Sequence, residues 1–126
     1  KKKLIDKITF TGELTGKALV EEYHLADALV MSSKYETFAI VLVEAMACGL
    51  PVIATNTGIA PEIVDEKTGK LVYEFTPQNF MEAMNQIAKT ITQYDGLTIR
   101  NKVVNRFNET SIGQSLKAIY TIVLSS

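Results

Sequence analysis

Residues 33–49 read SKYETFAIVLVEAMACG, and this stretch decides the fold. After a short polar loop it is apolar almost without interruption from Phe38 to Cys48, and it stops at Gly49, with Pro51 just beyond. Apolar residues on every side are typical of a helix inside a core, and glycine followed by proline is a common helix end. We therefore expect a buried helix over residues 38–48.

Short apolar segments alternate with helical patterns on both sides of this helix. Strands are expected at residues 8–11, 28–31, 51–55 and 69–73. Further helices are expected at 15–24, at 61–64, after a cap at Thr76, after Gly96, and from 110 or 111 onward. The alternation predicts an α/β fold with a Rossmann-like parallel sheet and helices on both faces. We expect residues 1–126 to form a single domain.

The composition excludes several function classes. The 126 residues are 47% hydrophobic and 21% charged, with a net charge of −1, which argues against a nucleic-acid partner. Cys48 and His24 are each the only residue of their type, so we expect no metal site. There is no secretory signal pattern and no apolar stretch of membrane-spanning length. We expect a cytoplasmic protein, and peripheral contact with the inner face of a membrane stays open for the full-length protein.

Two carboxylates accompany the predicted helix. Glu44 lies among apolar residues, where a buried carboxylate needs hydrogen-bond donors because an unsatisfied polar group costs about 1–3 kcal/mol. The adjacent hydroxyls of a ribose suit its two oxygens, and a backbone amide or a surface lysine would serve equally well. Glu36 precedes the helix, beside the free amides of its first turn, where phosphate and sugar can bind. A charge that merely favours the helix dipole is the alternative for Glu36.

The spacing of Glu36 and Glu44, followed by AMACGLPVIAT, closely resembles the signature of glycosyltransferase family 4, the glycosyl transferases group 1. The resemblance extends from about Ile8 to Val72. It implies the C-terminal, nucleotide-sugar-binding half of a GT-B enzyme, in which two Rossmann-like domains enclose the active site. Residues 1–126 are then a partial, truncated domain, and the N-terminal acceptor domain is absent from them.

The resemblance also implies residue roles around the start of the helix. Glu36 matches the carboxylate at the catalytic centre that binds hydroxyls of the donor hexose. Phe38 and Ala39 match residues whose backbone amides face that sugar. Ile40 and Val41 match residues whose amides hold the diphosphate. The implied donor is therefore a nucleoside-diphosphate sugar, bound without a cofactor or metal.

Two further positions complete the implied donor site. Glu44 matches the carboxylate that grips the ribose, and Leu14 loosely matches a residue that packs on the base. The implied partners are the nucleotide sugar, the N-terminal domain of the same enzyme, and a sugar or lipid-linked acceptor.

The sequence departs from the family pattern in three ways. Ala39 and Ile59 stand where the family usually has glycine, and we expect the methyl group of Ala39 to face the sugar and narrow donor choice. The family's arginine and lysine that neutralise the diphosphate precede the segment matching 8–11, and neither Lys17 nor Lys70 lies where it could replace them. We therefore expect the chain alone to bind nucleotide weakly and to be inactive.

The resemblance implies a retaining glycosyltransferase that moves a hexose to an unknown acceptor. Two other functions stay open. One is a nucleotide-sugar epimerase of GT-B architecture, and the other is a non-catalytic α/β module that binds a nucleotide or a protein. Titration with several nucleotides separates them.

Overall fold

A computed structural model describes residues 4–125 and gives them an α/β architecture. Within these residues, three parallel strands form one sheet in the order β1-β2-β3. The elements in chain order are η1 (Ile5–Lys7), α1 (Gly16–Leu25), β1 (Leu29–Met31), α2 (Ile40–Ala47), β2 (Val52–Thr55), α3 (Ala60–Ile63), β3 (Gly69–Val72), α4 (Pro77–Thr90), η2 (Ile91–Gln93), α5 (Gly96–Phe107) and α6 (Glu109–Ser125). The predicted α/β fold is confirmed.

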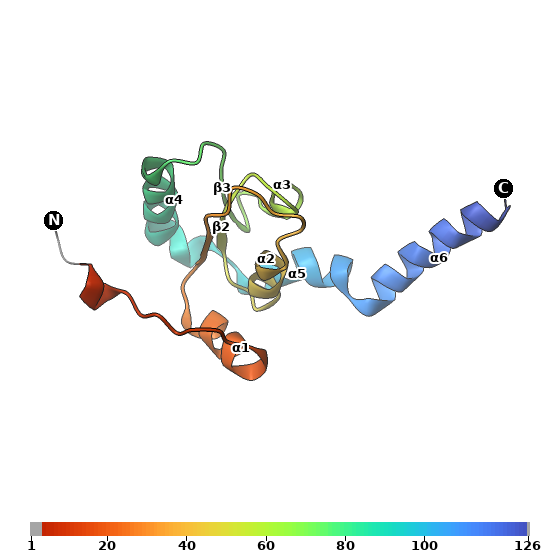
Figure 1. Cartoon of the computed structure of the whole chain (residues 1–126), viewed down its shortest axis with the longest axis horizontal. Coiled ribbons are helices and arrows are strands. Elements are labelled where there is room, and N and C mark those ends of the chain that lie inside the picture. Colours follow the sequence, from red (N-terminus) through yellow and green to blue (C-terminus); the bar gives the residue numbers. More distant parts are fainter. Residues whose placement is uncertain (1–3, 126) are drawn as a thin grey trace.

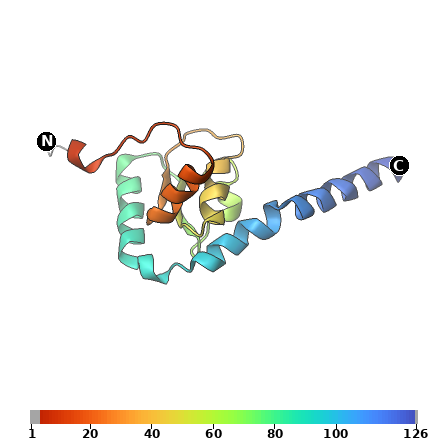
Figure 2. The ribbon, with the colours of Figure 1, turned by 90° about the horizontal axis from the view of Figure 1, so that it is seen from below.

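Helices cover both faces of the sheet (Figure 1). On one face α4 packs on β2 and β3, and on the other α2 packs on β1 and β2, with α5 against α2. The helix α1 lies beside α2 on the outer side (Figure 2). As in other parallel α/β units, the carboxyl ends of the strands meet at one edge, and the start of α2 lies there.

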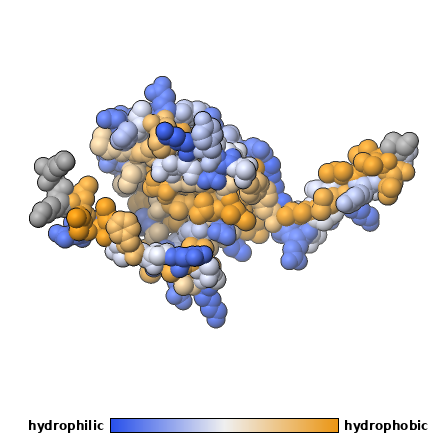
Figure 3. Space-filling view, viewed as in Figure 1, coloured by the Kyte–Doolittle hydropathy of each residue, from blue (hydrophilic) through white to orange (hydrophobic). Residues whose placement is uncertain are grey.

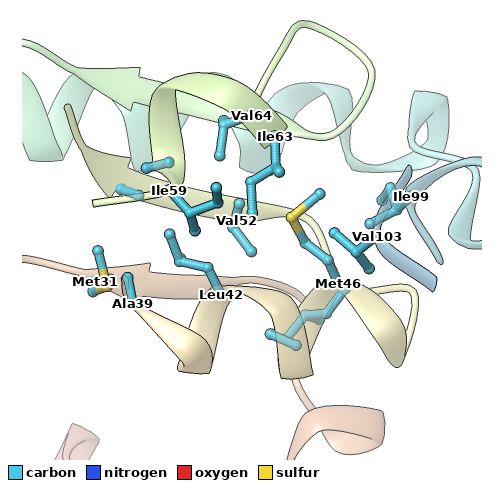
Figure 4. Packing of buried hydrophobic residues seen from close by; sticks show 14 of the residues in the cluster. Met31, Ala39, Leu42, Met46, Val52, Ile59, Ile63, Val64, Ile99 and Val103 are labelled. Atoms are coloured by element: carbon cyan, nitrogen blue, oxygen red, sulfur yellow. The ribbon is translucent and has the colours of Figure 1, made fainter. Parts of the chain in front are cut away.

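The central strand β2 separates two hydrophobic clusters. Val52 and Ala54 point into the larger cluster, with α2, α3 and α5, whereas Ile53 points into the smaller one beneath α4. The alternation follows from the two-residue period of a strand. Figure 4 shows buried side chains of the larger cluster packed between the sheet and the helices α2, α3 and α5. The labelled residues come from the strands β1 and β2, from these helices and from their caps: Met31, Ala39, Leu42, Met46, Val52, Ile59, Ile63, Val64, Ile99 and Val103.

The end of α2 is a glycine-dependent turn, as predicted. Gly49 adopts a φ of 81°, its N–H donates to the carbonyl oxygen of Met46, and the Leu50 N–H donates to that of Ala45. Glycine takes this left-handed conformation without the steric penalty of a Cβ atom. The turn reverses the chain at once into β2, so the helix and strand pack directly on each other.

The strand predicted at residues 8–11 is wrong. The segment is extended but pairs with no strand in the described part of the chain, and Ile8 and Phe10 are exposed, Phe10 by 93%. An alternating pattern becomes a strand only when a neighbouring strand supplies its hydrogen-bond partners. Figure 1 shows this segment running alone towards α1.

The last helix, α6, projects away from the body of the fold (Figure 1). None of its described residues is buried, and its apolar side chains form an exposed stripe that is visible in Figure 3. The stripe comprises Ile112, Leu116, Ile119, Tyr120 and Val123. Among the described helices, none is both long enough and apolar enough to cross a bilayer.

Candidate functional site

Two loops meet at the carboxyl edge of the sheet, one before α2 and one after β2. The Glu36 N–H donates to the hydroxyl oxygen of Thr57 at 3.2 Å, and the Ile59 N–H donates to the carbonyl oxygen of Phe38 at 2.8 Å. The hydroxyl of Thr55, at the end of β2, donates to the carbonyl oxygen of Ser33. These bonds fix the loop that carries Glu36 to the rigid sheet.

Gly58 allows this close approach. Its φ is 57°, and a Cβ atom built there would lie 2.8 Å from the carbonyl oxygen of Phe38 and 3.0 Å from the Cβ atom of Glu36. Both the left-handed backbone and the lack of space require glycine at this position. The shape of the loop around Glu36 therefore depends on a residue more than twenty positions further along the chain.

The start of α2 and the two residues before it present unpaired backbone amides. Within the described residues, the N–H groups of residues 38–41 donate to no protein acceptor. Their unpaired state and the positive end of the helix dipole together make a site for an anion. The N-cap residue, Ala39, adopts φ 74° and ψ 58°, a left-handed conformation that turns the chain into the helix.

The side chains of Ala39 and Ile59, which stand where the family usually has glycine, are buried in the core, which the sequence alone did not indicate. Ala39 is only 5% exposed and belongs to the larger hydrophobic cluster, next to Met31 in Figure 4. The expectation that its methyl group faces the sugar is therefore wrong. Ile59 is 6% exposed and packs in the same cluster, so its side chain is directed away from the loop surface. Each of the two side chains adds to the core.

The side chain of Phe38 connects the loop before α2 to the helix α5. Its ring meets Phe107 of α5 edge to face, with centroids 5.6 Å apart and planes at 89°. Arg106 lies over the Phe107 ring, 5.0 Å from its centroid, and forms an ion pair with Glu62 of α3. The amide of Phe38 is thereby held by packing of its own ring.

Glu36 is half-buried and its carboxylate forms no hydrogen bond or ion pair with a described residue. Lys34 lies two residues before Glu36, and its ammonium group is 5.3 Å from the ring centroid of Phe75, which follows β3. The side chain of Glu36 is free to accept hydrogen bonds from a ligand, and its backbone is fixed by Thr57.

Glu44 lies on the exposed face of α2, which differs from the expectation of a core carboxylate. The helix buries Leu42, Ala45 and Met46 against the sheet and α5, and Glu44 points to the other side, towards α1. There the hydroxyl of Tyr23 donates to Glu44 Oε2 at 3.2 Å. The alternatives of a backbone amide or a surface lysine do not occur among the described residues.

Tyr23 is the residue that the sequence reasoning did not place in the site. Burial, with the neighbouring carboxylate of Glu44 adding to it, raises the pKa of Tyr23 to about 12, so the phenol stays a hydrogen-bond donor at neutral pH. A signal was present, because Tyr23 shares the apolar side of its helix with Leu19, and a buried hydroxyl needs a partner.

The structure brings most of the predicted site residues together and leaves one apart. Glu36, the amides of residues 38–41 and Glu44 share one loop and helix. Leu14 is half-buried just before α1 and belongs to neither hydrophobic cluster. Across residues 4–125, no group of three or more histidine, cysteine, aspartate or glutamate side chains is arranged to hold a metal ion.

Proteins of known name and structure resemble this chain over most of its length. Spore coat protein SA of Bacillus subtilis (strain 168) is 30% identical over 120 residues, which cover 91% of this chain and 32% of that protein. Sucrose-phosphate synthase from Thermosynechococcus elongatus has a TM-score of 0.83 at 31% identity, over 95% of this chain and 31% of that chain. The chain spans about a third of the length of these relatives.

A second solved structure shares the fold. The lipopolysaccharide outer core galactosyltransferase WaaB, in its apo form, has a TM-score of 0.66 at 23% identity over 76% of this chain and 28% of that chain. The family model "Glycosyl transferases group 1" matches residues 1–97, which include the whole loop and helix described above. The chain belongs to the group 1 glycosyl transferases, and its fold is that of a GT-B glycosyltransferase domain.

Proposed function

We propose that this chain binds the donor of a retaining glycosyltransferase, which moves a hexose from a nucleoside-diphosphate sugar to an acceptor. One observation carries the proposal. A turn of unpaired amides, residues 38–41, lies between two carboxylates, Glu36 and Glu44, of which neither is paired with a cation among the described residues. A ligand with an anionic group in the middle and hydroxyl groups at both ends fits this arrangement, with the anion on the amides and the hydroxyls on the two carboxylates.

Each part of the donor has a group suited to it. The amides at the start of α2 can donate hydrogen bonds to the diphosphate, and Glu36 can accept hydrogen bonds from hexose hydroxyls. Glu44 lies one helical turn further on, where its carboxylate can accept from the ribose. As the bond between the hexose and the diphosphate breaks, negative charge grows on the diphosphate, and fixed amides stabilise it without reorganising.

The acceptor requires surfaces beyond this edge of the sheet. We propose that a second domain of the intact protein holds the acceptor opposite Glu36, as in the two-domain GT-B architecture. The acceptor, a sugar or a lipid-linked molecule, then approaches the hexose while the diphosphate stays on α2. The relative orientation of donor and acceptor supplies the entropic part of catalysis.

The test uses the intact protein and a panel of UDP-, GDP- and ADP-hexoses with sugar acceptors. We expect transfer with one base, loss of transfer in Glu36→Ala, and a product with the same anomeric configuration as the donor, read by NMR. Glu66→Ala, an exposed carboxylate in the loop before β3, is the matched control and should keep full activity.

Other outcomes identify the alternatives. An inverted product would contradict the retaining assignment. Epimerised nucleotide sugar formed without acceptor would indicate the epimerase. Nucleotide binding with neither product, across the panel, would favour a non-catalytic module.

A further inference from the structure

A tyrosine of one helix meets the carboxylate of the next. Tyr23 lies in the last turns of α1 and is 7% exposed, yet its hydroxyl reaches Glu44 Oε2 on α2 at 3.2 Å. The two helices run side by side in Figure 2. Tyr23 belongs to the larger hydrophobic cluster, so its ring is held in place by packing.

Glu44 has no other partner to fix its side chain. Within the described residues, Oε1 accepts no hydrogen bond, and neither carboxylate oxygen pairs with a lysine or arginine. An exposed glutamate samples several rotamers, and ordering it on ligand binding costs conformational entropy. A donor on a buried, packed ring selects one orientation before the ligand arrives, and hydrogen bonds to an ionised acceptor are stronger than neutral ones.

The hydroxyl of Tyr23 remains a hydrogen-bond donor at neutral pH. Because burial and the Glu44 carboxylate raise the pKa of Tyr23 to about 12, the hydroxyl is protonated throughout the neutral range. It therefore donates to Oε2 and leaves Oε1 open towards solvent. A packing role for the ring alone does not require the hydroxyl to meet a carboxylate.

We propose that Tyr23 is a positioning residue for nucleotide recognition: its hydroxyl holds Glu44 so that the carboxylate meets the 2′ and 3′ hydroxyls of the ribose. This inference rests on the proposed function, which assigns the ribose to Glu44. Tyr23 itself does not touch the donor.

The test is Tyr23→Phe, which removes the hydroxyl and keeps the ring. Calorimetry on the intact protein would compare UDP, GDP and ADP, and then the best binder with its 2′,3′-dideoxy analogue. We expect Tyr23→Phe to weaken binding of the ribonucleotide about 3- to 10-fold, the cost of one hydrogen bond. Binding of the dideoxy analogue should be unchanged, because no ribose hydroxyl meets Glu44 there.

Glu44→Gln separates this inference from the function on which it rests. If Glu44→Gln weakens ribonucleotide binding and Tyr23→Phe does not, the positioning role is overturned and the ribose site stands. If Glu44→Gln has no effect, the ribose assignment fails, and this inference with it. In the Glu44→Gln background, adding Tyr23→Phe should cost less than it does alone, because the two act as one unit.

A thermal unfolding measurement on each variant checks that it is folded. Tyr23→Met replaces the ring with a smaller, flexible apolar side chain that can adapt to the space, and it gives a second comparison should the phenylalanine variant unfold. Equal losses for the ribonucleotide and its dideoxy analogue in the folded variants would show that Tyr23 acts only through packing, and would overturn the proposal.

Discussion

The N–H of Ile59 donates to the carbonyl oxygen of Phe38 at 2.8 Å, and this bond joins the loop after β2 to the loop before α2. A second bond, from the Glu36 N–H to the Thr57 hydroxyl, lies beside it. The two loops come from different strands, so the position of the candidate donor site is set by the sheet.

Gly58→Ala tests this coupling. The new Cβ atom would lie 2.8 Å from the Phe38 carbonyl oxygen at a φ of 57°. We expect the free energy of unfolding to fall by about 1–3 kcal/mol and diphosphate binding to weaken, because the loop must move. Urea unfolding and calorimetry measure the two effects.

Gly113→Ala is the control for that variant. Gly113 lies within α6 and a Cβ atom there meets nothing within 4 Å. Alanine in a helix interior should be neutral or stabilising by up to about 1 kcal/mol. If Gly58→Ala behaves like Gly113→Ala, the close approach of the two loops is not what fixes the site.

Ala39→Gly should change stability little and donor choice not at all. Glycine removes the strain of alanine at φ 74°, but it also removes a buried methyl group worth about 0.8 kcal/mol. We expect a net change in the free energy of unfolding below about 1 kcal/mol. Ala39→Val should destabilise by more, since a β-branched side chain is strained further in this conformation. A changed preference among donor hexoses in Ala39→Gly would contradict this account and indicate that the methyl group of Ala39 faces the sugar.

The sequence was sufficient for local structure and for the order of the elements. The run of apolar residues ending at Gly49 predicted α2, and Thr76 caps α4 as expected, its side chain accepting from the Asn79 N–H. These features depend on neighbours within a few residues. The segment around Phe10 failed because a strand also needs a partner, and pattern alone does not supply one.

The candidate site was predictable in its residues but not in its contacts. Glu36 and Glu44 stood out by type and spacing, whereas the side to which Glu44 points depends on how α1 and α5 pack around α2. The same holds for Tyr23, whose partner lies on another helix. The direction of the Ala39 methyl group does not follow from the sequence, because a left-handed backbone turns it into the core.

Acid should weaken the fold through Asp65. Burial opposes its ionisation, but hydrogen bonds from Lys102, the Lys67 N–H and Thr68 outweigh that effect and lower the pKa of Asp65. A carboxyl group whose pKa is lower in the folded state than in the unfolded state stabilises the fold when the pH is above its unfolded-state pKa, which is roughly 4. This contribution is lost as the pH falls through the folded-state pKa.

Lys102→Met tests this contribution. Lys102 Nζ lies 2.8 Å from Asp65 Oδ2, and both side chains are more than a third exposed, so we expect a loss of about 0.2–1 kcal/mol at pH 7. The difference from the wild type should shrink towards zero near pH 2. Lys117→Met, on α6, lacks an ion pair within the described residues and should show no such pH dependence. A difference that persists in acid would assign the effect to packing.

The 126-residue chain on its own should bind nucleoside diphosphate weakly and transfer no sugar. The amides of residues 38–41 are unpaired, but transfer also requires the second domain that we propose for holding the acceptor. Transfer and donor hydrolysis would be assayed for this chain and for the intact protein side by side. Turnover by the chain at the rate of the intact protein would contradict the need for a second domain.

Calorimetry on Glu36→Ala and Glu44→Ala, each with the nucleoside diphosphate and with the nucleotide sugar, tests the arrangement of the donor most directly. Glu44→Ala should weaken both ligands alike, by about 1–3 kcal/mol, because both carry the ribose. Glu36→Ala should weaken only the nucleotide sugar, and Glu66→Ala should change neither. Equal losses for both ligands in both site variants would contradict the assignment of hexose to Glu36 and ribose to Glu44.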